Sequence, residues 1–350
     1  MIAKGSDSLK AYVGSTAVDK MYLGDTLVYS AAPEEPDVTD GYLTFKALES
    51  GTFTLSIPEG ITTENLGYVE YSTDGGSTWV RTNNADDTAV TITTPTISAK
   101  KKVLWRGSGS KYCNAGAYNG ATVYSHFSST GNFEIFGHIM SLTLLGNWNS
   151  VGTALESYIF AGLFRGCTNL IYANRLLLPG VLGEYCYLDM FRGCSNLVEI
   201  PELPATVMKN ACYSRMFYGD SNLPYTPNLP STSLANYCYN EMFAYCTNIT
   251  SAVLPATSGK TYGYRRMFYN ASKFAKLRMM FVTIAANSVT DYMNGVASSG
   301  LFCKNINATW TTTGKSGVPT GWTIIYYDSS TDKYYLSDKT TECDENGNVI

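Results

Sequence analysis

The chain has 350 residues, 15% charged residues and a formal net charge of −4, so it is long enough for about two or three domains and lacks the basic excess of a nucleic-acid-binding protein. It contains 27 tyrosines but only 2 histidines, which argues against most histidine-based metal sites and general bases. We therefore expect a folded, non-enzymatic protein with no catalytic residues, no metal and no cofactor.

The first residues show no apolar core of a secretory signal. No apolar stretch approaches the roughly 18 residues that a transmembrane helix requires, so we expect no membrane insertion. The 9 cysteines are then expected to be reduced, structural residues, because disulfide frameworks belong to secreted proteins.

Residues 1–31 contain a small internal duplication. The segment Tyr12–Val18 is echoed by Tyr22–Val28, and each copy predicts a strand, a glycine-centred turn and a second strand. Strands this short bury little apolar surface alone, so we expect the module to dock onto another protein. Residues 32–40 hold two prolines and several acids and predict a linker.

Residues 41–132 predict a small all-β, sandwich-like domain. Tyr42–Leu48 and Thr52–Ile57 alternate apolar and polar residues with period two. Two further strands flank Asp74-Gly75-Gly76, a strong hairpin signal.

A repeat follows in residues 133–300. Its period is 25 to 27 residues, marked by Phe164, Phe191, Phe217, Phe243 and Phe268. A period of this size with fixed apolar and proline positions predicts a solenoid. Residues 301–350 are expected to form its C-terminal cap and a β-hairpin.

The recurring residues predict how the coils pack. The phenylalanines should stack on their equivalents one coil away, and the cysteines should fill small apolar spaces between coils. A ladder of hydrogen bonds to backbone groups at a tight turn is expected from Asn169, Asn196, Asn222 and Asn248. Each coil should contain one short strand and one short helical turn. The expected fold class is mainly β with short helices: a leucine-rich-repeat-like solenoid preceded by the sandwich-like domain and the N-terminal hairpin module.

The repeat resembles a known family. Met190–Leu197 is Met-Phe-Arg-Gly-Cys-Ser-Asn-Leu, and Leu203–Thr206 is Leu-Pro-Ala-Thr. These strings look like the BspA-like leucine-rich repeats of gut Bacteroidales and their phages, and Gly314–Trp322 is similar to the closing segment of such chains. The period is longer than usual for that family. The N-terminal duplication resembles modules at the start of Bacteroidales phage structural proteins, which implies a virion component.

A single Asp-box offers a competing interpretation. Ser72–Trp79 fits the pattern Ser-x-Asp-x-Gly-x-Thr-Trp, which resembles the boxes of sialidase propellers and allows the hypothesis of a carbohydrate-active enzyme. Propellers repeat the box, whereas it occurs once here. We therefore favour a structural role, in which the aspartate caps the hairpin turn and the tryptophan packs beneath it.

The C-terminal segment supplies the candidate binding residues. Two tyrosine pairs, Tyr326–Tyr327 and Tyr334–Tyr335, flank a polar turn and predict a hairpin. Cross-strand tyrosines can simply stabilise such a hairpin, or they can offer an aromatic surface to a sugar or a partner chain.

Together these features favour a non-enzymatic phage virion structural protein, a head or tail fibre or appendage, that uses the solenoid for host attachment or particle decoration. Its expected partners are other virion proteins, bound through the N-terminal module, and a host-surface glycan or protein. We also expect a homo-oligomer, because multivalency raises avidity. The alternative is a BspA-like adhesin on a bacterial cell surface.

Overall fold

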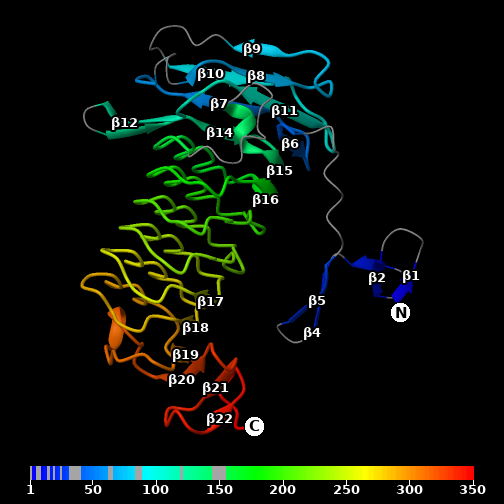
Figure 1. Ribbon diagram of the computed structural model, residues 1–350. Coiled ribbons are helices and arrows are strands. Elements are labelled where there is room, and N and C mark those ends of the chain that lie inside the picture. The colour runs from blue at the N-terminus through cyan, green and yellow to red at the C-terminus, as the bar shows by residue number, and fades with distance from the viewer. Residues whose placement is uncertain are drawn as a thin grey trace. The chain divides into compact units, whose positions relative to one another are not determined.

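The computed structural model describes residues 2–4, 9–13, 16–18, 20–23, 26–30, 41–61, 66–82, 89–118, 121–143 and 155–350 (Figure 1). The chain divides into two compact units, Met1–Gly41 and Tyr42–Ile350. The predicted linker 32–40 lies outside the described residues. Within the described part of the chain, no helix is both long and apolar enough to cross a bilayer.

The first unit consists of short antiparallel strands. They are β1 (Ile2–Lys4), β2 (Leu9–Val13), β3 (Thr16–Val18), β4 (Lys20–Leu23) and β5 (Thr26–Ser30). β2 pairs with β3 and β4 pairs with β5, so each copy of the duplication forms two paired strands, as predicted. The sheet order β1-β2-β3 adds one more strand to the first copy.

The second unit begins with two facing sheets. The larger has the order β16-β15-β6-β11-β8-β9 and the smaller the order β10-β7-β14, with a separate pair β12-β13. The bounds are β6 (Leu43–Ala47), β7 (Phe53–Ile57), β8 (Val69–Ser72), β9 (Val80–Thr82), β10 (Val90–Thr93), β11 (Lys102–Gly107), β12 (Cys113–Tyr118), β13 (Ala121–Tyr124), β14 (His126–Ser129), β15 (Phe133–His138) and β16 (Leu170–Leu177).

An aromatic core joins the two sheets. Phe45 of the larger sheet lies 5.4 Å from Phe53 and 4.8 Å from Phe127 of the smaller sheet, measured between ring centroids. All three rings are buried, because alternate residues of each strand point to the same face. The predicted sandwich-like packing is therefore confirmed.

Strand β15 connects this sandwich to the solenoid. It pairs antiparallel with β6 and parallel with β16, so one sheet runs from the sandwich into the first coil. A short 3-10 helix, η1 (Ile139–Leu142), follows it. The predicted boundary at residue 132 thus falls beside a strand that both regions share.

The C-terminal region is a β-solenoid of about three turns, and the predicted fold class is confirmed. Strands β17 (Ser251–Leu254), β18 (Lys276–Met279), β19 (Gly300–Asn305) and β20 (Trp322–Asp328) pair in parallel, coil upon coil (Figure 1). The cap follows as antiparallel strands β21 (Lys333–Tyr335) and β22 (Glu342–Cys343). A 3-10 turn, η2 (Gly314–Ser316), precedes β20.

The described coils between β16 and β17 contain no strand, so the predicted strand in every coil is wrong there. The main part of each coil is a ribbon of consecutive turns rather than a helix. The backbone N–H of Tyr187 donates to the next coil at Cys212 O, 3.0 Å away, whereas the N–H of Met190 donates back to Tyr187 O at 3.2 Å. This alternation continues along the ribbon. Tyr185 and Asp189 have positive φ angles of 56° and 55°, which cost about 1–2 kcal/mol each for residues with a Cβ. The predicted helical turn is wrong, because the hydrogen bonds between coils impose this backbone.

Aromatic columns run through the coils. The phenylalanines predicted to stack do so: Phe191 and Phe217 have centroids 5.6 Å apart with an angle of 2° between their planes, and Phe217 and Phe243 are 5.7 Å apart at 4°. A second column of buried tyrosines repeats the pattern, with Tyr213 and Tyr239 5.9 Å apart. Stacked pairs contribute about 0.5–1.5 kcal/mol beyond their buried area.

The cysteines are small core residues, as predicted. All 9 are free thiols and buried. Burial raises the pKa of Cys167 and of Cys212 to about 12, so these thiols are neutral near pH 7. Of the asparagines predicted to bond backbone groups, Asn169 does so, donating from Nδ2 to Ser129 O at 2.6 Å. Asn222 instead donates to a side chain, Asn196 Oδ1, at 3.2 Å.

One coil places a carboxyl group in a cysteine column. Asp220 occupies the position held by Cys194 in the preceding coil and by Cys246 in the next. Its side chain is fully buried, and neither carboxyl oxygen has a hydrogen-bond partner among the described residues. Burial raises the pKa of Asp220 well above its usual value, and nearby backbone N–H groups of Cys194 and Gly193 offset only part of this effect.

A column of alternating charge follows the middle position of the turn ribbon. It comprises Asp189, Arg215, Glu241, Arg266, Asp291 and, after the last of these, Lys315. The first pair is the tightest, since Arg215 donates to both carboxylate oxygens of Asp189 at 2.8 Å. Arg266 lies 3.7 Å from Glu241 and 3.8 Å from Asp291, and Lys315 lies 3.0 Å from Asp291. Neighbouring coils thus present opposite charges to each other.

Candidate functional site

The predicted tyrosines lie in a hairpin, on two different faces. Tyr326 of β20 pairs with Tyr335 of β21, and Tyr327 pairs with Tyr334. Because successive residues of a strand point to opposite faces, the structure divides the four side chains into two cross-strand pairs. Tyr327 and Tyr334 are in contact, with centroids 4.9 Å apart. The four rings do not form one continuous aromatic surface.

A cation accompanies each pair. On one face, the guanidinium of Arg278 lies 4.7 Å from the Tyr327 centroid, and its Nη1 donates to the Tyr334 hydroxyl at 2.7 Å. On the other face, Lys339 Nζ lies 4.5 Å from the Tyr326 centroid. Such contacts contribute about 0.5–1 kcal/mol at exposed sites. The Arg278 contact joins the hairpin to β18 of the solenoid, whereas Lys339 belongs to the cap itself.

A groove of about 330 Å³ adjoins the Tyr327 side of the hairpin. This volume falls within the range of small-molecule sites, about 300–1,000 Å³. The lining residues are Thr232, Val253, Pro255, Thr257, Arg278, Met280, Asn305, Tyr327 and Ser329. Of the four tyrosines proposed from the sequence, Tyr327 alone is among these residues.

The groove is built by the repeat itself. Thr232 and Thr257 occupy equivalent places after the proline of successive coils, and the N–H of Thr257 donates to Thr232 O at 3.4 Å. Val253 and Arg278 are register partners in β17 and β18. The strand alternation directs Leu254 and Met279 into the core and leaves their neighbours Val253 and Arg278 on the outer face. Sequence reasoning missed Arg278, although its place in the alternating string Lys-Leu-Arg-Met marks it as outward-facing.

The Asp-box forms the structural hairpin that the favoured interpretation predicts, between β8 and β9. Asp74 accepts from the Thr78 N–H at 2.9 Å and from the Thr78 hydroxyl at 2.6 Å. These hydrogen bonds lower the pKa of Asp74 to about 2. Trp79 Nε1 donates to Gly76 O at 3.0 Å, so the box residues are engaged in the turn that they build.

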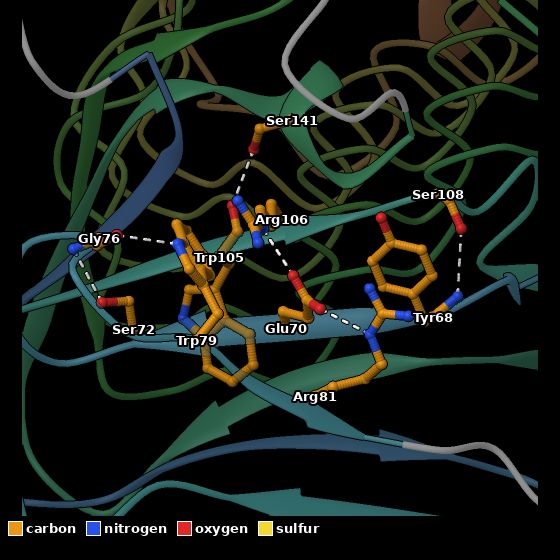
Figure 2. Close-up of polar contacts among 10 residues, drawn as sticks. All are labelled: Tyr68, Glu70, Ser72, Gly76, Trp79, Arg81, Trp105, Arg106, Ser108 and Ser141. Atoms are coloured by element: carbon orange, nitrogen blue, oxygen red, sulfur yellow. Dashed lines mark hydrogen bonds and ion pairs between the residues drawn. The ribbon is translucent and has the colours of Figure 1, made fainter.

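A charged cluster lies beside this hairpin (Figure 2). The buried carboxylate of Glu70 accepts from Arg81 Nε and Arg106 Nε, each at 2.6 Å. Tyr68 lies under the Arg81 guanidinium and Trp79 under that of Arg106, each 3.9 Å from the ring centroid. Burial raises the pKa of Glu70, but hydrogen bonds from Arg81 and Arg106 outweigh it and lower the pKa overall. Both cations are thus engaged by one carboxylate, which fixes the edge of the large sheet.

Among the described residues, no group of three or more histidine, cysteine, aspartate or glutamate side chains could hold a metal ion. A scan against protein-family models, a search of curated proteins and a search of solved structures each returned no match for this chain. The function therefore has to be argued from the groove and the repeat.

Proposed function

We propose that this chain is a non-enzymatic structural protein of a phage particle, and that its solenoid attaches the particle to a host surface. The observation that carries the proposal is the groove, whose lining comes from successive coils and from the C-terminal hairpin. The exposed Thr232 and Thr257 and the cation of Arg278 equip it for recognition. Meanwhile the cysteines and the stacked phenylalanines are buried in the core, where they serve the scaffold.

The phage setting rests on the resemblance of the repeats and of the N-terminal duplication. The separate compact unit Met1–Gly41 supports a docking role for the N-terminal module, because a compact unit of its own can bind the particle while the solenoid binds the host. A BspA-like adhesin would use the same groove from a cell surface, so location separates the two hypotheses. Homo-oligomerisation stays a prediction.

Deletion of residues 1–31 should remove the protein from purified phage particles. The expected cause is loss of the docking module. Immunoblotting of purified particles measures how much of the deletion variant is incorporated, in comparison with the intact chain carrying the same tag. The unit Tyr42–Ile350 is compact by itself, so the deletion variant should keep the thermal transition of the solenoid. Normal incorporation of this folded variant would contradict the docking role.

A further inference from the structure

We infer that the groove binds the carboxylate of an acidic sugar, such as a uronic acid, and that the Arg278 guanidinium receives it. This inference rests on the proposed attachment function and names the class of its ligand.

Arg278 is an oriented cation without a counter-charge. Among the described residues, no carboxylate lies within ion-pair distance of Arg278, in contrast to Arg106 and Arg215, which make short pairs with Glu70 and Asp189. Tyr327 and Tyr334 hold its guanidinium in place. The single hydrogen bond to Tyr334 leaves most of the five guanidinium N–H donors for a ligand, and a planar guanidinium matches a carboxylate in two parallel hydrogen bonds.

The nearby acids are engaged elsewhere. Asp332 accepts a hydrogen bond from the Tyr327 hydroxyl at 2.8 Å, and Glu345 lies 3.6 Å from Lys276 Nζ. Arg278 is the one charged side chain among the residues that line the groove. That charge favours an anionic ligand over a neutral one.

The remaining lining favours a sugar. The hydroxyls of Thr232, Thr257 and Ser329 make no hydrogen bond to other described residues, and they can pair with ligand hydroxyls. Val253, which is 45% exposed, and the adjoining Met280 offer apolar surface to the C–H groups of a sugar ring. The two threonines repeat from one coil to the next, which suits a chain of repeating sugars.

An acidic peptide fits the groove less well. Strands β18 and β19 are each paired on both sides, so a further strand could add only at β17, the edge of this sheet, and not beside Arg278 of β18. Peptide recognition by strand addition needs a free sheet edge. At Arg278 a peptide would depend on side chains alone, and the exposed hydroxyls would lose their matching partners.

Binding of the purified full-length chain to tetragalacturonate, measured by isothermal titration calorimetry, tests the inference. Fully methyl-esterified tetragalacturonate is the matched ligand control, because it has the same rings without the negative charge. We expect the ester to bind about tenfold or more weakly. Affinity for the acid should also fall as salt rises, since the contact is ionic and partly exposed.

Variants locate the site. Arg278→Gln should weaken tetragalacturonate binding about tenfold or more, and Arg278→Lys should fall between this variant and the wild type, because lysine keeps the charge without the planar fork. Lys339→Gln removes a cation on the other face of the hairpin and should bind like the wild type. Thr257→Val, at an exposed position, should weaken binding while leaving the fold intact, so the test does not depend on Arg278 variants alone.

Three results would overturn the inference: equal binding of acid and ester, wild-type affinity in both Arg278→Gln and Thr257→Val, or binding of a hexaglutamate peptide in place of tetragalacturonate. None of these results concerns particle incorporation. A failure of the deletion experiment would remove the virion role and leave the groove's ligand standing, so the two failures are distinguishable.

Discussion

Replacing Arg215 by methionine should destabilise the solenoid by about 3 kcal/mol, the lower end of the cost of breaking a buried ion pair. The Asp189 side chain is 1% exposed, whereas that of Arg215 is 32% exposed. Without the guanidinium, the carboxylate keeps two side-chain contacts among the described residues, the Tyr124 hydroxyl at 3.0 Å and a longer contact to Arg192 at 3.5 Å. These two contacts explain why we expect the lower end of the range.

Urea unfolding followed by circular dichroism measures this loss, compared at equal m-value. Arg266→Met is the matched control in the same charge column. Its ion pairs are 3.7 and 3.8 Å long, and the side chains of its partners Glu241 and Asp291 are 17% and 16% exposed. Water can therefore solvate these two carboxylates when the guanidinium is removed. An equal loss of unfolding free energy in Arg215→Met and Arg266→Met would show that the burial of Asp189 does not determine the loss.

Replacing Asp220 by cysteine should stabilise the chain by about 1–3 kcal/mol at pH 7, because an unpartnered buried polar group is removed. The neighbouring coils already accommodate Cys194 and Cys246 at this position, so the replacement fits the column. Urea midpoints of the variant and the wild type, determined side by side, measure the gain.

The gain should depend on pH. Burial raises the pKa of Asp220 in the folded chain, whereas an unfolded aspartate titrates near about 3.9. The folded state therefore binds more protons than the unfolded state above about pH 4, and wild-type stability falls as pH rises through the folded pKa. We expect the advantage of Asp220→Cys to be larger at pH 7 than at pH 4.

Asp220→Asn separates the charge from the shape. It has nearly the same size but does not titrate, so the pH dependence attributed to Asp220 should disappear in this variant as well. A gain from Asp220→Cys that stays the same between pH 4 and pH 7, or a loss of stability at pH 7, would show that the carboxyl group is not strained by its burial.

The coil period and the core columns could be predicted from the sequence because they depend on which side chains recur. Phe191 and Phe217 repeat at 26 residues, and repeating bulky residues must stack if the coils do. The same reasoning placed Cys194 and Cys246 in the core. The Asp-box turn was also predictable, since Asp74 and Thr78 are close in sequence and their hydrogen bonds are local.

The backbone of the turn ribbon could not be predicted in this way. Tyr185 and Asp189 adopt positive φ angles that their side chains disfavour, and hydrogen bonds from one coil to the next stabilise them. The backbone preference of the individual residues therefore predicts the wrong conformation for the ribbon. The charge column was missed for a related reason: Asp189 and Arg215 are 26 residues apart and meet only once the coils are in register.

The candidate site was predicted in part. The hairpin and its cross-strand tyrosines follow from the sequence, but the groove needs Thr232, Arg278 and Tyr327 together, and these come from separate coils. Of these three residues, Tyr327 alone was proposed from the sequence. The four tyrosines lie on two faces because successive residues of a strand point to opposite sides. The number of aromatic residues in the segment does not show this division.

The alternating charges also restrict how this array can change in length. Loss of the single coil that carries Arg215 would bring Asp189 beside Glu241, and two carboxylates would meet at a partly buried position. Loss of two coils, those of Arg215 and Glu241, would bring Asp189 beside Arg266 and restore attraction. Insertion of one coil would likewise place equal charges side by side, whereas insertion of two coils would keep the alternation. Solenoids of this type should therefore gain and lose coils in pairs, although each coil is a complete structural unit.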